Sequence, residues 1–168
     1  YFGTGYQPMV YDKTLSYIKG TISNQLKLST YWNWYNELSF QLVDPNAPLH
    51  LPVIFTRQRL AFEGNFFKNL FLSTGLEMIY HSAFRPDAYM PLTGQFYLQD
   101  QFTTNNRPIA NVFLNFRIKR FKGFIRMEQL NTLLATSNQL GTRYQFTAPN
   151  YLGTGTWLRV GIWWNFIN

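Results

Sequence analysis

The sequence predicts an all-β chain that forms an antiparallel transmembrane β-barrel. The C-terminal stretch Trp157–Ile167 alternates an apolar face with a mixed face, as a strand between two different solvents does. Aromatic residues make up 19% of the chain and charged residues only 14%, against roughly 25% charged in soluble domains. Short and long connections also alternate between the expected strands, which is typical of barrels with turns on one side of the membrane and loops on the other.

The first two expected strands occupy residues 15–27 and 31–43, joined by a short turn. Apolar side chains take up alternate positions in both, opposite polar ones. These apolar positions include Ile18, Ile22, Leu26, Trp32, Trp34, Leu38, Phe40 and Leu42. The segment 44–52 contains three prolines and is expected to be a loop.

Strands three and four are expected at residues 53–63 and 70–84, with a short turn at 65–69 between them. A turn centred near residue 67 places Arg57 opposite Glu77, which predicts a cross-strand ion pair. A long connection at 85–108 follows, with a small hairpin expected at 95–103.

The last three strands are expected at residues 109–119, 124–130 and 157–167. The connection 120–123 is short and the connection 131–156 is long, so the segments 85–108 and 131–156 are the expected long extracellular loops. Their aromatic residues are expected to close the loops over the barrel mouth; the alternatives are that they stack on sugars or hold a partner. These residues are Tyr89, Phe96, Tyr97, Tyr144 and Tyr151.

The expected strand number indicates an incomplete barrel. Seven strands are odd, whereas single-chain bacterial barrels normally have an even number, from about 8 upward. The sequence opens on Tyr1, which is not a translational start. We therefore expect residues 1–168 to be a single β-barrel segment. It supplies about seven to eight strands as the C-terminal portion of a larger barrel, or as part of a wall that another chain completes.

The charged residues of the expected strands share one face, which would line the pore. An Arg or Lys on the lipid face would cost roughly 2–4 kcal/mol at mid-depth. Two interpretations stay open: a cationic lining that favours anionic solutes, or a ladder of ion pairs that fills the barrel. The residues are Lys19, Lys27, Glu37, Arg57, Arg59, Glu63, Glu77, Arg117, Lys119, Arg126, Glu128 and Arg159.

Other chemistry is poorly supported, so we expect no enzyme, metal or cofactor. Glu63 and Glu77 fall several residues out of register, which disfavours a pair of catalytic carboxylates. His50 and His81 lack metal-ligand spacing, and the chain has no cysteine. The net charge of +7 comes mostly from single, scattered basic residues, so nucleic acid is not an expected partner.

The end of the chain carries a candidate assembly signal. The spacing of Arg159, Gly161, Trp164 and Phe166 resembles the C-terminal signal that outer-membrane barrels present to their insertion machinery. Large aromatic residues also gather near the expected short turns, as in the aromatic girdle of a barrel. They are Trp32, Phe62, Phe66, Phe67, Phe71, Phe121, Phe124, Trp164 and Phe166.

Four stretches together resemble the putative porins of Bacteroidota outer membranes. They are Pro52–Glu63 with Phe66–Lys68, Asp87–Pro91 with Gly94–Gln99, Asn111–Arg120, and Leu158–Phe166. The resemblance implies a Gram-negative outer-membrane barrel in contact with lipid, the insertion machinery, and a missing N-terminal part or other outer-membrane chains. It supports an outer-membrane barrel better than any named solute, and we expect a porin-like channel for passive transport of small solutes, anionic ones if the lining is cationic. A structural barrel subunit of a larger assembly and a soluble all-β binding module are the alternatives.

Overall fold

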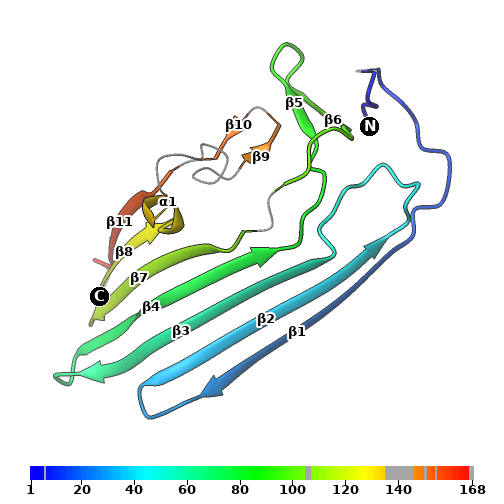
Figure 1. The fold of residues 1–168 in the computed structure, drawn as a ribbon. Helices are drawn as coiled ribbons and strands as arrows, with labels where there is room; N and C mark the ends of the chain where they lie inside the picture. Colours follow the sequence, from blue (N-terminus) through cyan, green and yellow to red (C-terminus); the bar gives the residue numbers. More distant parts are fainter. Residues whose placement is uncertain (6, 105–106, 135–145, 150, 154, 167–168) are drawn as a thin grey trace.

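The computed structural model describes residues 1–5, 7–104, 107–134, 146–149, 151–153 and 155–166. Its main feature is one antiparallel seven-stranded sheet in the order β1-β2-β3-β4-β7-β8-β11 (Figure 1). The strands are β1 (Tyr17–Lys27), β2 (Trp32–Val43), β3 (Ile54–Phe66), β4 (Leu70–His81), β7 (Ile109–Ile118), β8 (Phe121–Glu128) and β11 (Trp157–Trp164). The all-β prediction and the order of these strands are confirmed.

Smaller elements occupy the long connections. Strands β5 (Ala88–Met90) and β6 (Gln95–Tyr97) form one hairpin, and β9 (Phe146–Ala148) pairs with β10 (Tyr151–Leu152). A single helical turn, α1 (Asn131–Leu134), follows β8. The predicted hairpin at 95–103 is therefore wrong in its extent, because its second strand is 95–97 and its partner precedes it.

Several predicted strand ends are also wrong. Strand β3 continues to Phe66 and β8 begins at Phe121, so both hairpin turns are tighter than predicted. Lys119 lies in the turn between β7 and β8 rather than in a strand, with a positive φ of 50°. Strand β11 ends at Trp164, and residues 167–168 lie outside the described part.

The connections of the sheet alternate in length as predicted. Short turns join β1 to β2, β3 to β4 and β7 to β8, whereas the long connections join β2 to β3, β4 to β7 and β8 to β11. In Figure 1 the C-terminus lies with the short turns and the N-terminus with the long loops. Within the described ranges, no helix is long and apolar enough to cross a membrane.

The apolar face of the sheet is its exposed face. Ile22 and Ile162, on the two edge strands, are 71% and 74% exposed. Apart from Gly123, which the Phe116 ring covers on the apolar face, the buried residues of the seven strands lie instead on the polar face. They are Ser39, Ala61, Ser73, Glu77, Asn111 and Phe113. This distribution is the reverse of that in a soluble sheet packed on a core.

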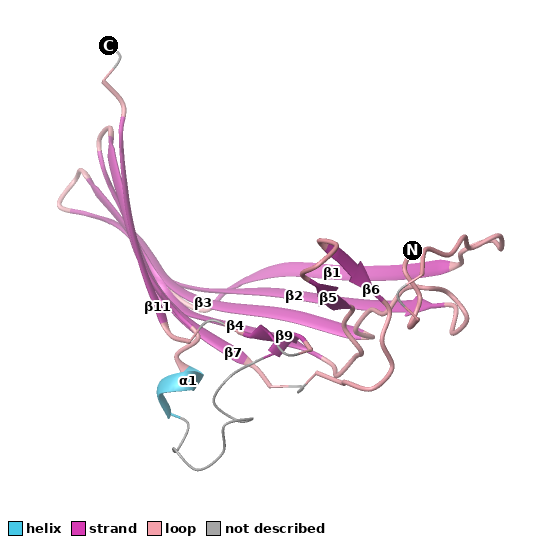
Figure 2. Cartoon of the chain, turned by 90° about the horizontal axis from the view of Figure 1, so that it is seen from above, coloured by secondary structure: helices cyan, strands magenta, loops and turns pink. Residues whose placement is uncertain are grey.

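The polar face lies on the concave side of the sheet. Figure 2 shows the sheet twisted and curved. Two contacts on the polar face reach across an intervening strand: Arg126 of β8 bonds Glu77 of β4, and Arg59 of β3 covers the Phe113 ring of β7 at 4.4 Å. Side chains of non-adjacent strands meet in this way on the concave side of a curved sheet, where they converge.

Small residues allow this curvature near the centre of the sheet. Ala61 is fully buried and pairs with Gly75 of β4. A Cβ atom on Gly75 would lie 2.0 Å from the Leu60 carbonyl oxygen. The backbones of β3 and β4 thus approach too closely here for any side chain at position 75.

One polar row interrupts the apolar face. Asn24, Asn36 and Gln58 lie opposite one another on β1, β2 and β3. The Gln58 amide donates to the Thr56 hydroxyl at 2.9 Å, and that hydroxyl donates to the Glu37 carbonyl at 3.0 Å. Hydrogen bonds within the sheet therefore satisfy some of the polar groups on this face.

Candidate functional site

The register of β3 and β4 assembles the charged residues of the polar face. Arg59 lies opposite Glu77, and Arg57 lies opposite Ile79. The predicted pairing of Arg57 opposite Glu77 is therefore wrong by two residues, since the turn is 67–69 rather than 65–69. The error leaves every side chain on its predicted face, because a shift of two preserves the alternation of a strand.

Glu77 is the centre of the main charge network. Its side chain is only 3% exposed, although it sits on a polar face. Arg57 reaches it diagonally and donates to Oε2 from both Nε (2.9 Å) and Nη2 (2.6 Å). Arg126 donates to Oε1, and the Asn111 amide donates to the same oxygen at 3.3 Å. The predicted Arg57–Glu77 ion pair therefore exists despite the different register.

The network continues to the last strand. Arg126 Nε lies 3.0 Å from Glu128 Oε1, and Arg159 of β11 donates to the same oxygen. Three arginines and two glutamates thus alternate from β3 to β11. Their charges sum to +1, so the network is close to neutral.

A second network surrounds Glu63. Its Oε2 accepts hydrogen bonds from Tyr35 (2.6 Å) and Asn33 (3.2 Å), while its Oε1 accepts one from Ser73 (2.8 Å). Arg59 Nη2 lies 3.3 Å from Oε1 and also donates to Ser73 at 3.1 Å. The two carboxylates therefore belong to separate networks rather than to one shared site: Glu63 pairs with Arg59, and Glu77 pairs with Arg57 and Arg126.

Other charges of the polar face stand outside these networks. Across the described strands, Lys19, Lys27, Arg117 and Lys122 have no carboxylate within 4.0 Å. Glu37 lies opposite Arg57 but makes no ion pair, since the guanidinium turns to Glu77. The polar face thus combines paired charges with exposed cations.

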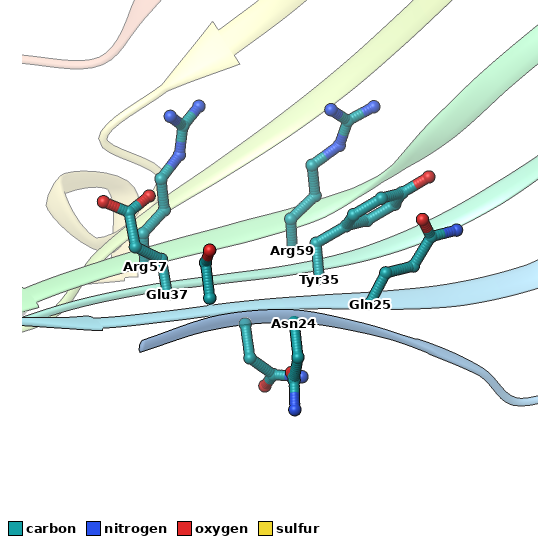
Figure 3. Close-up of a pocket in the computed structure, with 8 residues that line it drawn as sticks. Asn24, Gln25, Tyr35, Glu37, Arg57 and Arg59 are labelled. Atoms are coloured by element: carbon teal, nitrogen blue, oxygen red, sulfur yellow. The ribbon is translucent and has the colours of Figure 1, made fainter. Parts of the chain in front are cut away.

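The polar face is hollowed along its width. Figure 3 shows the first hollow, about 440 Å³, with Gln25, Tyr35, Glu37, Arg57 and Arg59 on one side of the sheet and Asn24 on the other. A second hollow, about 300 Å³, shares Arg57 and Arg59 with the first. A third, about 540 Å³, shares two further residues with the second, Asn115 and Phe124. The three hollows therefore adjoin one another.

Aromatic rings cluster at the short-turn ends. One cluster spans β2 and β3, with ring centroids 5.5–5.7 Å apart, and the other spans β7, β8 and the C-terminal strand, at 5.1–5.9 Å. Their members are Tyr31, Trp32, Phe62 and Phe66, and Phe116, Phe121, Trp164 and Phe166. Phe71 and Phe124 of the predicted girdle lie instead on the polar face, opposite Arg117 and Gly161.

The residues of the candidate assembly signal lie on both faces of β11. Trp164 pairs with Phe121 and stacks on Phe166 at 5.1 Å, on the apolar face. Gly161 lies on the polar face, where the Phe124 ring covers it so closely that a Cβ would be 2.2 Å from Cε1 of the ring. The signal function itself stays a prediction.

Contacts between the long loops are aromatic and ionic. The Tyr89 ring of β5 lies 5.1 Å from Phe96 and 5.7 Å from Tyr151, which connects the two loops. Tyr144 lies outside the described residues. His50 Nδ1 lies 3.7 Å from Asp87 Oδ1, and burial raises the pKa of Asp87 while His50 partly offsets this. The described residues contain no group of three or more candidate metal ligands.

The comparison with models of known protein families finds a match. A family model with the description "Putative porin" matches residues 1–168, the full length of the chain. No curated protein and no solved structure matches.

Proposed function

The chain belongs to the putative porin family, and from this membership we propose that it forms part of the wall of an outer-membrane β-barrel. The apolar convex face contacts lipid, and the charged concave face lines a water-filled lumen. The barrel conducts small solutes passively, with a preference for anions. The long loops 85–108 and 131–156 lie on the extracellular side, and the short turns on the periplasmic side.

The inverted burial of the sheet is the observation that supports this proposal best. A soluble protein does not leave a whole sheet face of large apolar side chains exposed, since water would penalise it. In lipid the same face is favourable, and the charges must then point inward. Strands β1 to β4 and β7 contain 10–13 residues each, enough for the roughly 9–11 that a tilted strand needs to cross.

The open edges of the sheet support a wall completed by further strands. Strand β1 pairs only with β2, and β11 pairs only with β8, in the part of the chain described. Unpaired backbone groups in lipid cost several kcal/mol each, so membrane sheets close into barrels. We therefore propose that more strands, from the same protein or from another chain, pair with these two edges.

The test is conductance of the full-length protein in planar lipid bilayers. We expect discrete conductance steps. Under a KCl gradient, we expect the reversal potential to shift from zero toward the equilibrium potential of chloride. A barrel that inserts but carries no current would instead indicate a structural subunit of a larger assembly, which the near-neutral ion-pair network favours. A protein that stays monomeric and folded in water without detergent would contradict both.

A further inference from the structure

Two cations lie side by side on the polar face near the short turns. Arg117 of β7 and Lys122 of β8 are direct cross-strand partners. Like charges in this position repel each other and destabilise a sheet. Neither has a carboxylate within 4.0 Å in the described structure. The pair is thus an electropositive site that an anion would stabilise.

Aromatic rings flank the two cations in the same cross-strand row. Phe71 of β4 lies opposite Arg117, and Trp163 of β11 lies opposite Lys122. The Arg117 guanidinium lies 5.3 Å from the centre of the Phe71 ring. The four strands therefore present the order aromatic, cation, cation, aromatic.

The next row provides a hollow with an apolar floor. In this row Asn115, Phe124 and Gly161 line the hollow, together with the aromatic residues and cations of the first row. Because Gly161 has no side chain, the Phe124 ring lies directly against its backbone. The resulting hollow, about 540 Å³, falls in the range of roughly 300–1,000 Å³ typical of small-molecule sites.

We propose that this hollow binds small anions that carry an aromatic ring. The anionic group lies between Arg117 and Lys122, and the ring packs against Trp163 and Phe124. The guanidinium and the ammonium supply charge-assisted hydrogen bonds, and the rings supply stacking area. This deepens the proposed function, on which it rests, by placing a solute site at the periplasmic end of the lumen.

Isothermal titration of the full-length protein in detergent tests the site. The probe is naphthalene-2-carboxylate. Its comparison ligands are acetate, which has the charge alone, and 2-naphthylmethanol, which has the ring alone. We expect saturable binding of the probe, and affinities at least about tenfold lower for both comparison ligands, since each loses one class of contact.

Matched variants locate the binding. Lys122→Gln and Trp163→Leu are each expected to weaken the probe about tenfold, the loss of one charge-assisted or stacking contact. Lys27→Gln removes a polar-face cation from β1, and Trp157→Leu removes a tryptophan from the same face of β11. Both controls should bind the probe like the parent protein.

Two results would overturn the proposal. One is equal affinity for naphthalene-2-carboxylate and 2-naphthylmethanol, which indicates that both partition into apolar surface or micelles. The other is equal loss in Lys122→Gln and Lys27→Gln, which indicates a general effect of net charge. Conductance measured in parallel separates the two hypotheses: a conducting protein without the site refutes only the site, and a binding protein without current refutes only the channel.

Discussion

Leu76→Arg tests directly whether the apolar face contacts lipid. Leu76 is near the middle of β4 and is 57% exposed on the apolar face. Its cross-strand partners are Leu60 and Val112, so an arginine there meets no carboxylate. If water covers this face, the substitution changes the free energy of unfolding by no more than about 0.5 kcal/mol. In lipid it costs about 2–4 kcal/mol.

Reversible urea unfolding in phospholipid vesicles measures this difference through tryptophan fluorescence. A loss of about 3 kcal/mol corresponds to more than a hundredfold change in the folding equilibrium. The control is Ser23→Arg on the polar face of β1, where Ser23 is exposed and lies opposite the unpaired Glu37. We expect the control to be neutral or stabilising, because the new arginine faces a carboxylate. Equal effects of the two substitutions would refute the lipid assignment.

Three further predictions concern the networks, the curvature and the C-terminus. Glu77→Gln leaves Arg57 without a carboxylate partner and leaves Arg126 with Glu128 alone. Because these arginines stay 45% and 27% exposed, we expect a loss of about 2 kcal/mol, below the 3–5 kcal/mol of a fully buried pair. Gly75→Ala places a Cβ 2.0 Å from the backbone of β3 and should cost about 1–3 kcal/mol or block folding. Trp164→Ser with Phe166→Ser should reduce the amount of full-length protein in the outer membrane several-fold, as measured by immunoblot of membrane fractions.

Each of these three predictions has its own control. Glu37→Gln removes a carboxylate without an ion pair, and if it destabilised the protein as much as Glu77→Gln, the central role of Glu77 would be wrong. Gly20→Ala adds a Cβ that meets nothing within 4 Å, so it should be tolerated. Trp157→Ser removes an exposed aromatic residue outside the signal, and equal membrane levels of this variant and the double variant would contradict the signal.

The sequence predicted the strands, their order and their faces because each depends on a local pattern. A period of two in apolar residues is visible over 8–13 residues, whatever the partner strand is. Register depends on the turn instead, and the β3–β4 turn has no glycine to mark it. Phe67 and Lys68 take positive φ values of 49° and 66°, a conformation usually left to Gly, Asn or Asp. The turn was therefore placed too early.

The contacts of the candidate site depend on curvature, which no local pattern encodes. The Arg126–Glu77 contact joins strands that are not neighbours, so strand pairing alone could not predict it. The same holds for Arg59 over Phe113. Phe71 and Phe124 were assigned to the girdle from their position near the turns, whereas their parity places them on the polar face. For this reason the hollow beside Arg117 and Lys122 was not predicted from the sequence. The alternation along β4 and β8 nevertheless places both rings on the face of these cations.

The two interpretations of the charged face apply to different parts of it. Arg57, Glu77, Arg126, Glu128 and Arg159 neutralise one another down to a single positive charge, so their main physical effect is to brace the concave side. At ordinary salt concentrations, an ion in water interacts appreciably only with charges within about 8–10 Å. Its interaction with a nearly neutral network is weak even at that distance. Any anion preference must therefore come from the cations outside it. In the described strands, Lys27, Arg117 and Lys122 lie at the short-turn end, whereas Lys19 lies at the long-loop end of β1. Most of the anion preference is therefore expected at the periplasmic end of the proposed lumen rather than at its middle.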